Sequence, residues 1–306
     1  VSSVERWETI AELVRQRLAE GLRPVVVHSA LATVSNKLDE LLHRALEMDV
    51  TAQVAGIREL HLRLAAGLQV DGEKELGGYF RELEQLLAGI HLIREVSPRI
   101  QARVMGLGEL MATRLGAAYL ARVGLKVTWL DARELLRSNM PPGTNERSAW
   151  LAANCDFDPD AELQARFAAE AGVVLTQGFI ASNARGDGVL LGRGGSDTSG
   201  AYFAAKLQAA VLEIWTDVPG MFTANPKVVP GARLLRLLSY EEAQEIASTG
   251  GSVLHPRCIR PCKRHDIPLK VLCTSQPELP GTLVTARSGS DGPRVKAILG
   301  RSRITL

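Results

Sequence analysis

The chain has 306 residues, 46% of them hydrophobic and 23% charged, which is the balance of a globular protein with ample core. Its 36 basic and 34 acidic residues give a net charge of +2, without a basic stripe, so nothing favours nucleic acid as a partner. No run of about 18 apolar residues is present, which argues against a membrane span. The 4 cysteines fit a reducing compartment, and we therefore expect a cytoplasmic protein.

The first half of the chain is predicted to be largely helical. Apolar residues recur at helical spacing in four stretches, whereas two short β-branched runs indicate buried strands. The predicted helices cover residues 4–21, 37–46, 51–95 with a break near Gly72, and 99–123. The predicted strands cover residues 23–27 and 126–130.

In the second half, predicted strands and helices alternate. The strands cover residues 173–177, 210–215, 269–272 and 281–284, and a hairpin tip is expected over 183–188. The helices cover residues 161–171, 198–210, 239–247 and 252–265. Strands separated by helices, each followed by a polar loop, predict an α/β fold with a mainly parallel sheet covered on both faces.

A glycine-rich loop, Gly192-Arg193-Gly194-Gly195-Ser196-Asp197, stands before one of these helices. Its glycines permit a sharp turn and close approach to a ligand, and a helix N-terminus attracts anions. Arg193 adds a bidentate fork for a carboxylate or phosphate. The alternative is a turn capped by Ser196 or Asp197 with nothing bound. Because such a turn needs no guanidinium, a binding loop is favoured.

Two other stretches are ambiguous on their own. Ser29 and Ser35 follow the strand at 23–27, where open parallel sheets bind ligands, but Ser35 or Asn36 could simply cap a helix. Gly106 and Gly108 lie within a predicted helix, at a cost of about 1 kcal/mol each, so close packing or a ligand should compensate. Glu109 beside them is either a solvated helix charge or a binding-site acid.

A metal site is not predicted. His255, Cys258, Cys262 and His265 share one helical face, but two prolines interrupt it and the spacing matches no common zinc pattern. Buried cysteines on an amphipathic helix are the ordinary case.

Several motifs occur together in one order. They are Ser29 with Ser35-Asn36, Gly108-Glu109, Gln177-Gly178-Phe179-Ile180 with the glycine loop, Thr216-Asp217-Val218-Pro219-Gly220 with Asn225-Pro226, and Val253-Leu254-His255-Pro256. This order resembles that of the aspartate kinases over residues 1–286. The resemblance implies the amino-acid-kinase (carbamate-kinase-like) fold, a three-layer αβα sandwich with a mainly parallel central sheet.

The resemblance also implies a domain organisation. Residues 1–287 would form the amino-acid-kinase catalytic domain, and residues 288–306 a linker and the start of a truncated regulatory ACT domain. The parent would be a monofunctional or bifunctional protein, and a homo-oligomer at full length.

The implied reaction transfers the γ-phosphoryl group of ATP to the β-carboxylate of L-aspartate, giving 4-phospho-L-aspartate. It is the first step of lysine, threonine and methionine biosynthesis, with Mg²⁺ bound through the nucleotide. A carboxylate is already ionised at neutral pH, so catalysis needs positioning and charge stabilisation rather than a general base.

The resemblance assigns roles to individual residues. Arg193, Asp197 and Glu109 form the catalytic set: Arg193 pairs a substrate carboxylate, and the two acids hold the ammonium group. The remaining substrate-binding residues would be Ser29, Ser35, Gly194, Gly195 and Ser196. The nucleotide-binding residues would be Gly192, Thr216, Asp217, Phe222, Lys227 and Ser252.

The chain departs from the family pattern in several places. The family's first strand and Lys-Phe-Gly-Gly-Thr-Ser phosphate loop should stand immediately before Val1, so the chain as given is expected to be an impaired kinase. At four positions this chain has a different residue from the one usual in the family: Ser35 replaces Thr, Phe222 replaces Tyr, Lys227 replaces Arg and Ser252 replaces Lys. Two alternatives stay open: another amino-acid kinase of the same fold, and a non-catalytic regulatory domain that binds ATP or aspartate.

Overall fold

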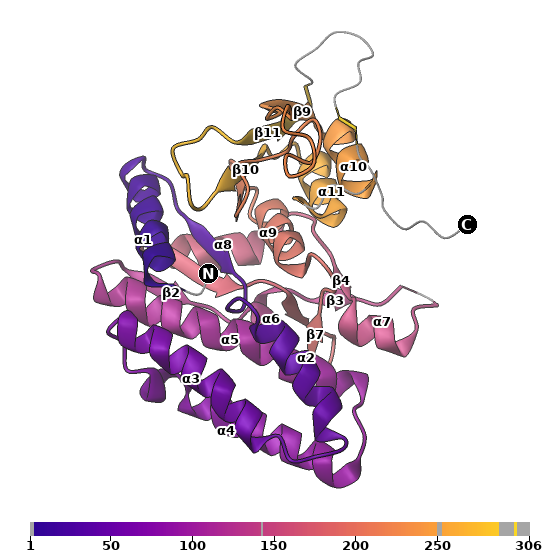
Figure 1. The fold of residues 1–306 in the computed structure, drawn as a ribbon. Coiled ribbons are helices and arrows are strands. Elements are labelled where there is room, and N and C mark those ends of the chain that lie inside the picture. The colour runs from indigo at the N-terminus through magenta and orange to yellow at the C-terminus, as the bar shows by residue number, and fades with distance from the viewer. Residues whose placement is uncertain (1–2, 142, 250–252, 288–296, 299–306) are drawn as a thin grey trace. The chain divides into compact units, whose positions relative to one another are not determined.

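The computed structural model describes residues 3–141, 143–249, 253–287 and 297–298. Contacts divide the chain into two compact units. Figure 1 draws the helices and strands of the chain, coloured by residue number. The first consists of Val1–Asp156 and Ala165–Ser196, and the second of Phe157–Gln164 and Asp197–Leu306. The prediction of a single catalytic domain over 1–287 stays a prediction, and its residues belong to both units.

A parallel sheet of three strands lies in the first unit, in the order β1-β5-β2. These strands are β1 (Val25–His28), β5 (Val173–Gln177) and β2 (Val127–Trp129). Every residue of the middle strand, β5, is buried. Its sequence is a run of three apolar residues followed by Thr and Gln, which is typical of a parallel strand covered on both faces. Two short antiparallel pairs, β3 (Ser138–Asn139) with β4 (Asn154–Cys155) and β6 (Ile180–Ser182) with β7 (Gly188–Leu190), complete the strands of this unit.

One long helix, α5 (Pro98–Arg122), contacts all three strands of this sheet. Ser97 caps it by accepting a hydrogen bond from the Ile100 backbone N–H at 3.3 Å, and Pro98 occupies its first turn. The other helices wholly within the unit are α1 (Val4–Ala19), α2 (Val34–Ala45), α3 (Thr51–Gly67), α4 (Gly72–Ile93), α6 (Ala132–Leu135) and α7 (Glu146–Leu151). Helices α2 and α4 pack on α5, which is therefore enclosed between helices and sheet.

The second unit holds a sheet of four strands in the order β8-β10-β11-β9. The strands are β8 (Leu212–Thr216), β10 (Leu269–Cys273), β11 (Thr282–Thr285) and β9 (Leu237–Ser239). Only the β10–β11 pair is antiparallel. Helices α10 (Tyr240–Thr249) and α11 (Pro256–Arg264) supply core residues against this sheet. The residues of helices α8 (Ala161–Ala169) and α9 (Gly195–Lys206) are divided between the two units.

The predicted fold class, α/β with mainly parallel strands, is confirmed. Most predicted elements are present, with ends shifted by a few residues. The strand β9 and the pair β3–β4 were not predicted, because segments of two or three residues carry no periodicity. The last predicted helix begins at Pro256 and continues through Pro261. Within the described ranges, none of the helices is both long and apolar enough to cross a bilayer.

Trp7 anchors α1 against α5. Its side chain is fully buried and stacks on His28, with ring centroids 4.6 Å apart. The ring lies against Gly116 of α5, where a Cβ would be 2.8 Å from one Trp7 carbon and closer still to two others. Only a residue without a side chain allows this contact.

We expect Gly116→Ala to destabilise the protein by about 1–3 kcal/mol, because the new methyl group overlaps the indole and the core must shift. Urea denaturation would measure the change in the free energy of unfolding. Gly78→Ala is the matched control, since Gly78 lies within α4 with open space around its Cα. The free energy of unfolding of this control should rise by about 0.5–1 kcal/mol, because Ala has a higher helix propensity than Gly. Equal effects of the two substitutions would contradict the packing argument.

Candidate functional site

The glycine-rich loop makes the sharp turn that its sequence predicts. Gly192 and Gly194 have φ values of +72° and +65°, which favour glycine, and α9 begins at Gly195. A Cβ at Gly195 would lie 2.5 Å from the Phe179 ring, and one at Gly178 would lie 2.8 Å from Ser196. The loop and the turn at residues 178–179 therefore lie in backbone contact.

Two of the predicted substrate-binding serines come together here. The Ser29 hydroxyl, exposed at the end of β1, donates a hydrogen bond to the Ser196 hydroxyl at 2.7 Å. Arg193 in the same unit is exposed, and no hydrogen bond or ion pair joins its guanidinium to another described residue. The side chain is thus available for an external anion.

The loop between β1 and α2, residues 29–33, is called the serine loop and enters α2 in an unexpected way. Thr33 is the N-cap residue, with a left-handed φ of 71° and no capping hydrogen bond from its side chain. Ser35 lies half-buried in the first turn, followed by Asn36. The alternative that Ser35 or Asn36 caps this helix is therefore wrong.

Glu109 lies in the buried middle of α5, with a relative exposure of 3%. Gly108 beside it allows the helix to approach the serine loop, since a Cβ there would lie 3.1 Å from that of Ala30. Close packing thus offsets the helix cost of this glycine, as one of the two alternatives predicted. The interpretation of Glu109 as a solvated helix charge is wrong.

The Glu109 carboxyl is sparsely paired. Its Oε1 accepts a hydrogen bond from the Ala30 backbone N–H at 3.3 Å, and its buried Oε2 has no partner among the described residues. Loss of hydration raises the pKa of this carboxyl to about 8, although backbone hydrogen bonds oppose the shift. A buried oxygen without a partner is costly and is suited to receiving a donor from a ligand.

The other predicted site residues belong to the second unit. Asp197 lies in the first turn of α9; burial raises its pKa, and a hydrogen bond from the His255 backbone partly opposes this. Thr216 ends β8, and its hydroxyl lies 3.2 Å from the Asp217 carboxylate.

The remaining nucleotide residues are less constrained. Asp217 and Lys227 are exposed and Phe222 is half-buried. Ser252 lies outside the described residues. The site residues are divided between two units, and their joint assignment stays a prediction.

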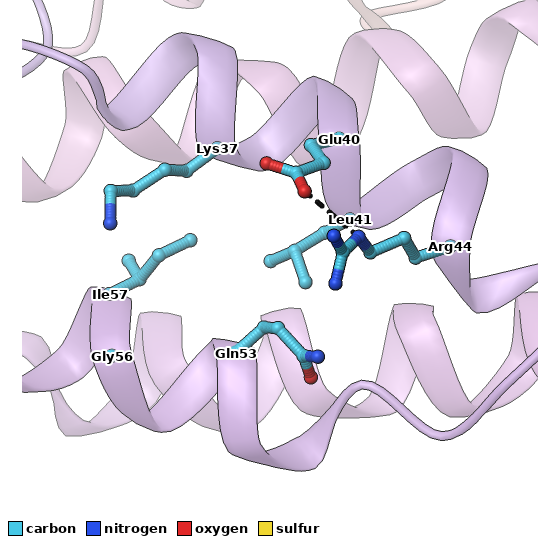
Figure 2. Close-up of a pocket in the computed structure, with 7 residues that line it drawn as sticks. All are labelled: Lys37, Glu40, Leu41, Arg44, Gln53, Gly56 and Ile57. Atoms are coloured by element: carbon cyan, nitrogen blue, oxygen red, sulfur yellow. Dashed lines mark ion pairs between the residues drawn. The ribbon is translucent and has the colours of Figure 1, made fainter.

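Two cavities lie elsewhere in the first unit. One of about 160 Å³ separates α2 from α3 and is lined in part by Lys37 and the ion pair of Glu40 with Arg44, at 2.8 Å (Figure 2). Another, of about 360 Å³, has Arg99, Arg103 and Arg133 in its lining. Neither cavity is lined by a predicted site residue. Among the residues that the structure describes, no three His, Cys, Asp or Glu side chains are grouped to hold a metal ion.

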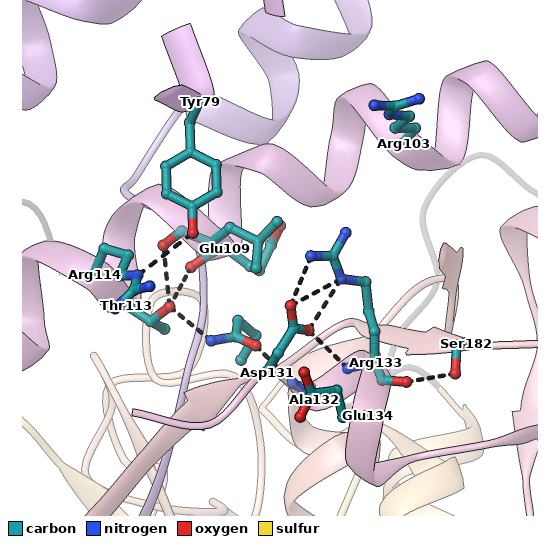
Figure 3. A network of polar contacts seen from close by, with 12 residues as sticks. Tyr79, Arg103, Glu109, Thr113, Arg114, Asp131, Ala132, Arg133, Glu134 and Ser182 are labelled. Carbon is teal, nitrogen blue, oxygen red and sulfur yellow. Dashed lines mark hydrogen bonds and ion pairs between the residues drawn. The ribbon is translucent and has the colours of Figure 1, made fainter. Parts of the chain in front are cut away.

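The sequence did not reveal a polar network beneath Glu109 (Figure 3). Its centre is Thr113, one helical turn after Glu109, together with Gln177 and Trp129. The four-residue spacing of Thr113 from Glu109 was the available signal, but partners from other elements cannot be read from spacing.

A parallel α/β core, a glycine loop at a helix N-terminus, an exposed arginine and a buried acid are together features suited to binding a small charged molecule. The chain belongs to the amino acid kinase family, whose family model matches residues 1–273.

Individual relatives agree with this assignment. Aspartokinase 2, chloroplastic, of Arabidopsis thaliana is 32% identical over 318 residues, covering 100% of this chain and 56% of that protein. Lysine-sensitive aspartokinase 3 of Escherichia coli (strain K12) is 33% identical over 287 residues, covering 92% and 62%. The crystal structure of E. coli aspartokinase III with aspartate and ADP matches with a TM-score of 0.82 at 31% identity, covering 94% of this chain and 62% of that one. The chain thus spans about half the length of the curated relatives it matches.

The raised pKa of Glu109 predicts a stability that falls as pH rises. Between pH 4.5 and about 8 this carboxyl is ionised in the unfolded chain but protonated in the folded protein, so rising pH favours unfolding. Glu109→Gln keeps the shape and cannot ionise. Its stability relative to wild type should therefore rise by a few kcal/mol between about pH 4 and about pH 8. Urea denaturation at both pH values measures this, and a difference independent of pH would contradict it.

Proposed function

We propose that the complete protein is an aspartate kinase that phosphorylates the β-carboxylate of L-aspartate with ATP. The observation that carries the proposal is the buried Glu109 carboxyl, whose Oε2 has no partner among the described residues, in the same unit as the exposed guanidinium of Arg193. These two groups complement the ammonium group and a carboxylate of an amino acid. The aspartokinase relatives support this choice of substrate.

In this proposal each residue has a defined task. Arg193 binds one substrate carboxylate, while Glu109 and Asp197 hold the ammonium group. Ser29, Ser35 and the backbone of Gly194, Gly195 and Ser196 complete the substrate site. Because the β-carboxylate is ionised at neutral pH, none of these residues has to remove a proton from it.

The reaction is an in-line transfer. A β-carboxylate oxygen forms a bond to the γ-phosphorus as the bond from that phosphorus to the β,γ-bridging oxygen breaks, and ADP leaves with the electron pair. Since the chain forms no covalent intermediate, its contribution is positioning and charge stabilisation.

The nucleotide requires its own contacts. The positive φ of Gly192 and the helix that follows the loop suit phosphate oxygens, and Thr216, Asp217, Phe222 and Lys227 are assigned to the rest of ATP, with Ser252. Mg²⁺, bound through the nucleotide, would neutralise the charge that develops on the phosphates. The Thr216 hydroxyl and the Asp217 carboxylate carry oxygen atoms of the kind that Mg²⁺ takes as ligands.

Assignments of domains, location, assembly and partners complete the proposal. Residues 1–287 would be the catalytic domain and 288–306 a linker and the start of a regulatory ACT domain. The full-length protein would be a cytoplasmic homo-oligomer. It would have neither a nucleic acid nor a membrane as a partner.

An aspartyl-hydroxamate assay of the complete protein with ATP and Mg²⁺ tests the function. We expect aspartate-dependent product, and we expect Arg193→Ala to weaken aspartate binding by roughly 2–5 kcal/mol, because a carboxylate loses its charge partner. Arg63→Ala, at an exposed arginine of α3, is the matched control and should change nothing.

The contrary outcomes are distinct. Turnover of another amino acid in place of aspartate would assign a different kinase of this fold. Binding of ATP or aspartate without turnover would favour a regulatory domain. Unchanged aspartate affinity in Arg193→Ala would remove that residue from the site.

Aspartate binding should release a proton. An ammonium group beside Glu109 stabilises its ionised form and lowers its pKa from about 8, so up to about one proton leaves per aspartate bound near neutral pH. Calorimetric titrations in buffers of different ionisation enthalpy measure this release. Glu109→Gln should abolish it, and Glu59→Gln, at an exposed position, should retain it. Release that persists in Glu109→Gln would assign the proton to another group.

A further inference from the structure

The buried hydroxyl of Thr113 is a saturated junction of hydrogen bonds. It accepts one bond from Gln177 Nε2 at 2.9 Å and one from Trp129 Nε1 at 3.0 Å. Both of these groups can only donate, so the hydroxyl hydrogen points to the helix, where the Glu109 carbonyl oxygen lies at 2.9 Å and that of Leu110 at 3.2 Å. All the hydrogen-bonding capacity of this hydroxyl is therefore used.

Gln177 extends the junction into the sheet. Its side chain is fully buried at the end of β5, and its Oε1 accepts a hydrogen bond from the Ala132 backbone N–H at 2.7 Å. That N–H can only donate, which orients the amide and leaves its NH₂ group for Thr113. Trp129, at the end of β2, is held by Arg114, whose guanidinium lies 4.0 Å from the indole centroid. The junction thus ties α5 to the ends of β5 and β2 and to the start of α6.

The carboxyl of Glu109 has little support of its own. A single hydrogen bond, at 3.3 Å from the Ala30 N–H, is its one contact with a described donor from another element. Its position consequently depends on where the helix backbone at residue 109 is held. Thr113 contacts that backbone directly, and Gln177 also precedes Gly178, which packs on the Ser196 end of the glycine loop.

We propose that Thr113 and Gln177 are positioning residues that set the Glu109 carboxyl for an ammonium group of the substrate. This inference rests on the proposed function for the identity of that substrate. It extends the site from groups that would touch aspartate to a buried layer beneath them. Such support matters because a displacement of about 1 Å at a binding group can cost up to 100-fold in rate.

The test compares isosteric variants of the complete protein. Thr113→Val removes the hydroxyl and keeps the shape, whereas Thr113→Ser keeps the hydroxyl. Thr176→Val is the matched control: this neighbouring threonine of β5 is equally buried, and its hydroxyl has no partner among the described residues. Trp129→Phe is a milder variant that removes one donor from the junction and serves if Thr113→Val does not fold.

We expect Thr113→Val to raise the KM for aspartate about tenfold while the KM for ATP stays within about twofold. Thr113→Ser should restore the aspartate KM, Trp129→Phe should raise it less, and Thr176→Val should leave it unchanged. A merely structural role would raise both KM values together or lower activity uniformly. That outcome, or a wild-type aspartate KM in Thr113→Val, would overturn the proposal.

A second readout is independent of activity. In ligand-free protein labelled with [5-¹³C]glutamate, the Glu109 carboxyl signal is identified by its loss in Glu109→Gln. Thr113→Val should shift this signal, and Thr176→Val should not. If the wild type fails to phosphorylate aspartate, the proposed function fails, but the carboxyl shift still decides the positioning role. An unshifted signal in Thr113→Val would refute it.

Discussion

The burial of Glu109 in the middle of α5 is the constraint on which the proposed site depends. An acid placed between a parallel sheet and packed helices loses its hydration, and the Ala30 N–H is the one described donor from another element that it gains in return. Such a group is tolerated in its neutral form and becomes useful when a ligand offers a charge. The surrounding features, namely close helix packing, the serine loop and the buried junction at Thr113, all determine where that carboxyl lies.

Close approach of backbones recurs around this helix. Gly116 admits the ring of Trp7, and Gly108 brings the serine loop against α5. A glycine within a helix lowers helix stability by about 1 kcal/mol relative to Ala. Buried apolar contacts offset this cost where neighbouring side chains pack against the glycine. At Gly178 and Gly195 the same device joins the turn after β5 to the glycine loop. The site is therefore assembled by backbone proximity, with side chains such as Arg193 free to meet a ligand.

The sequence predicted those features that have a period or a local chemical signature. Long amphipathic helices, short β-branched strands and the turn at Gly192 and Gly194 follow from spacing and from steric freedom. What it could not predict depends on tertiary contacts. The left-handed Thr33 displaced the expected cap, and strand β9 is too short to have a period. Spacing alone could not distinguish a solvated Glu109 from a buried one, because the burial comes from other elements, such as β1, β5 and α2, that pack around α5.

The raised pKa of Glu109 also gives the proposed site a way to distinguish ligands with an ammonium group from ligands without one. When the Glu109 carboxyl is neutral, it does not repel the negative carboxylates of a ligand. A dicarboxylate can then approach Arg193. A ligand without an ammonium group leaves Glu109 protonated and its second oxygen without a charged partner. A ligand with an ammonium group allows ionisation, and its charge compensates the desolvation that disfavours the ionised acid in the free protein. In the proposed site, selectivity for an amino acid over a plain dicarboxylate would therefore follow from the same burial that makes the carboxyl costly. Under our proposal, the layer formed by Thr113 and Gln177 would preserve this selectivity by holding the acid in its buried position.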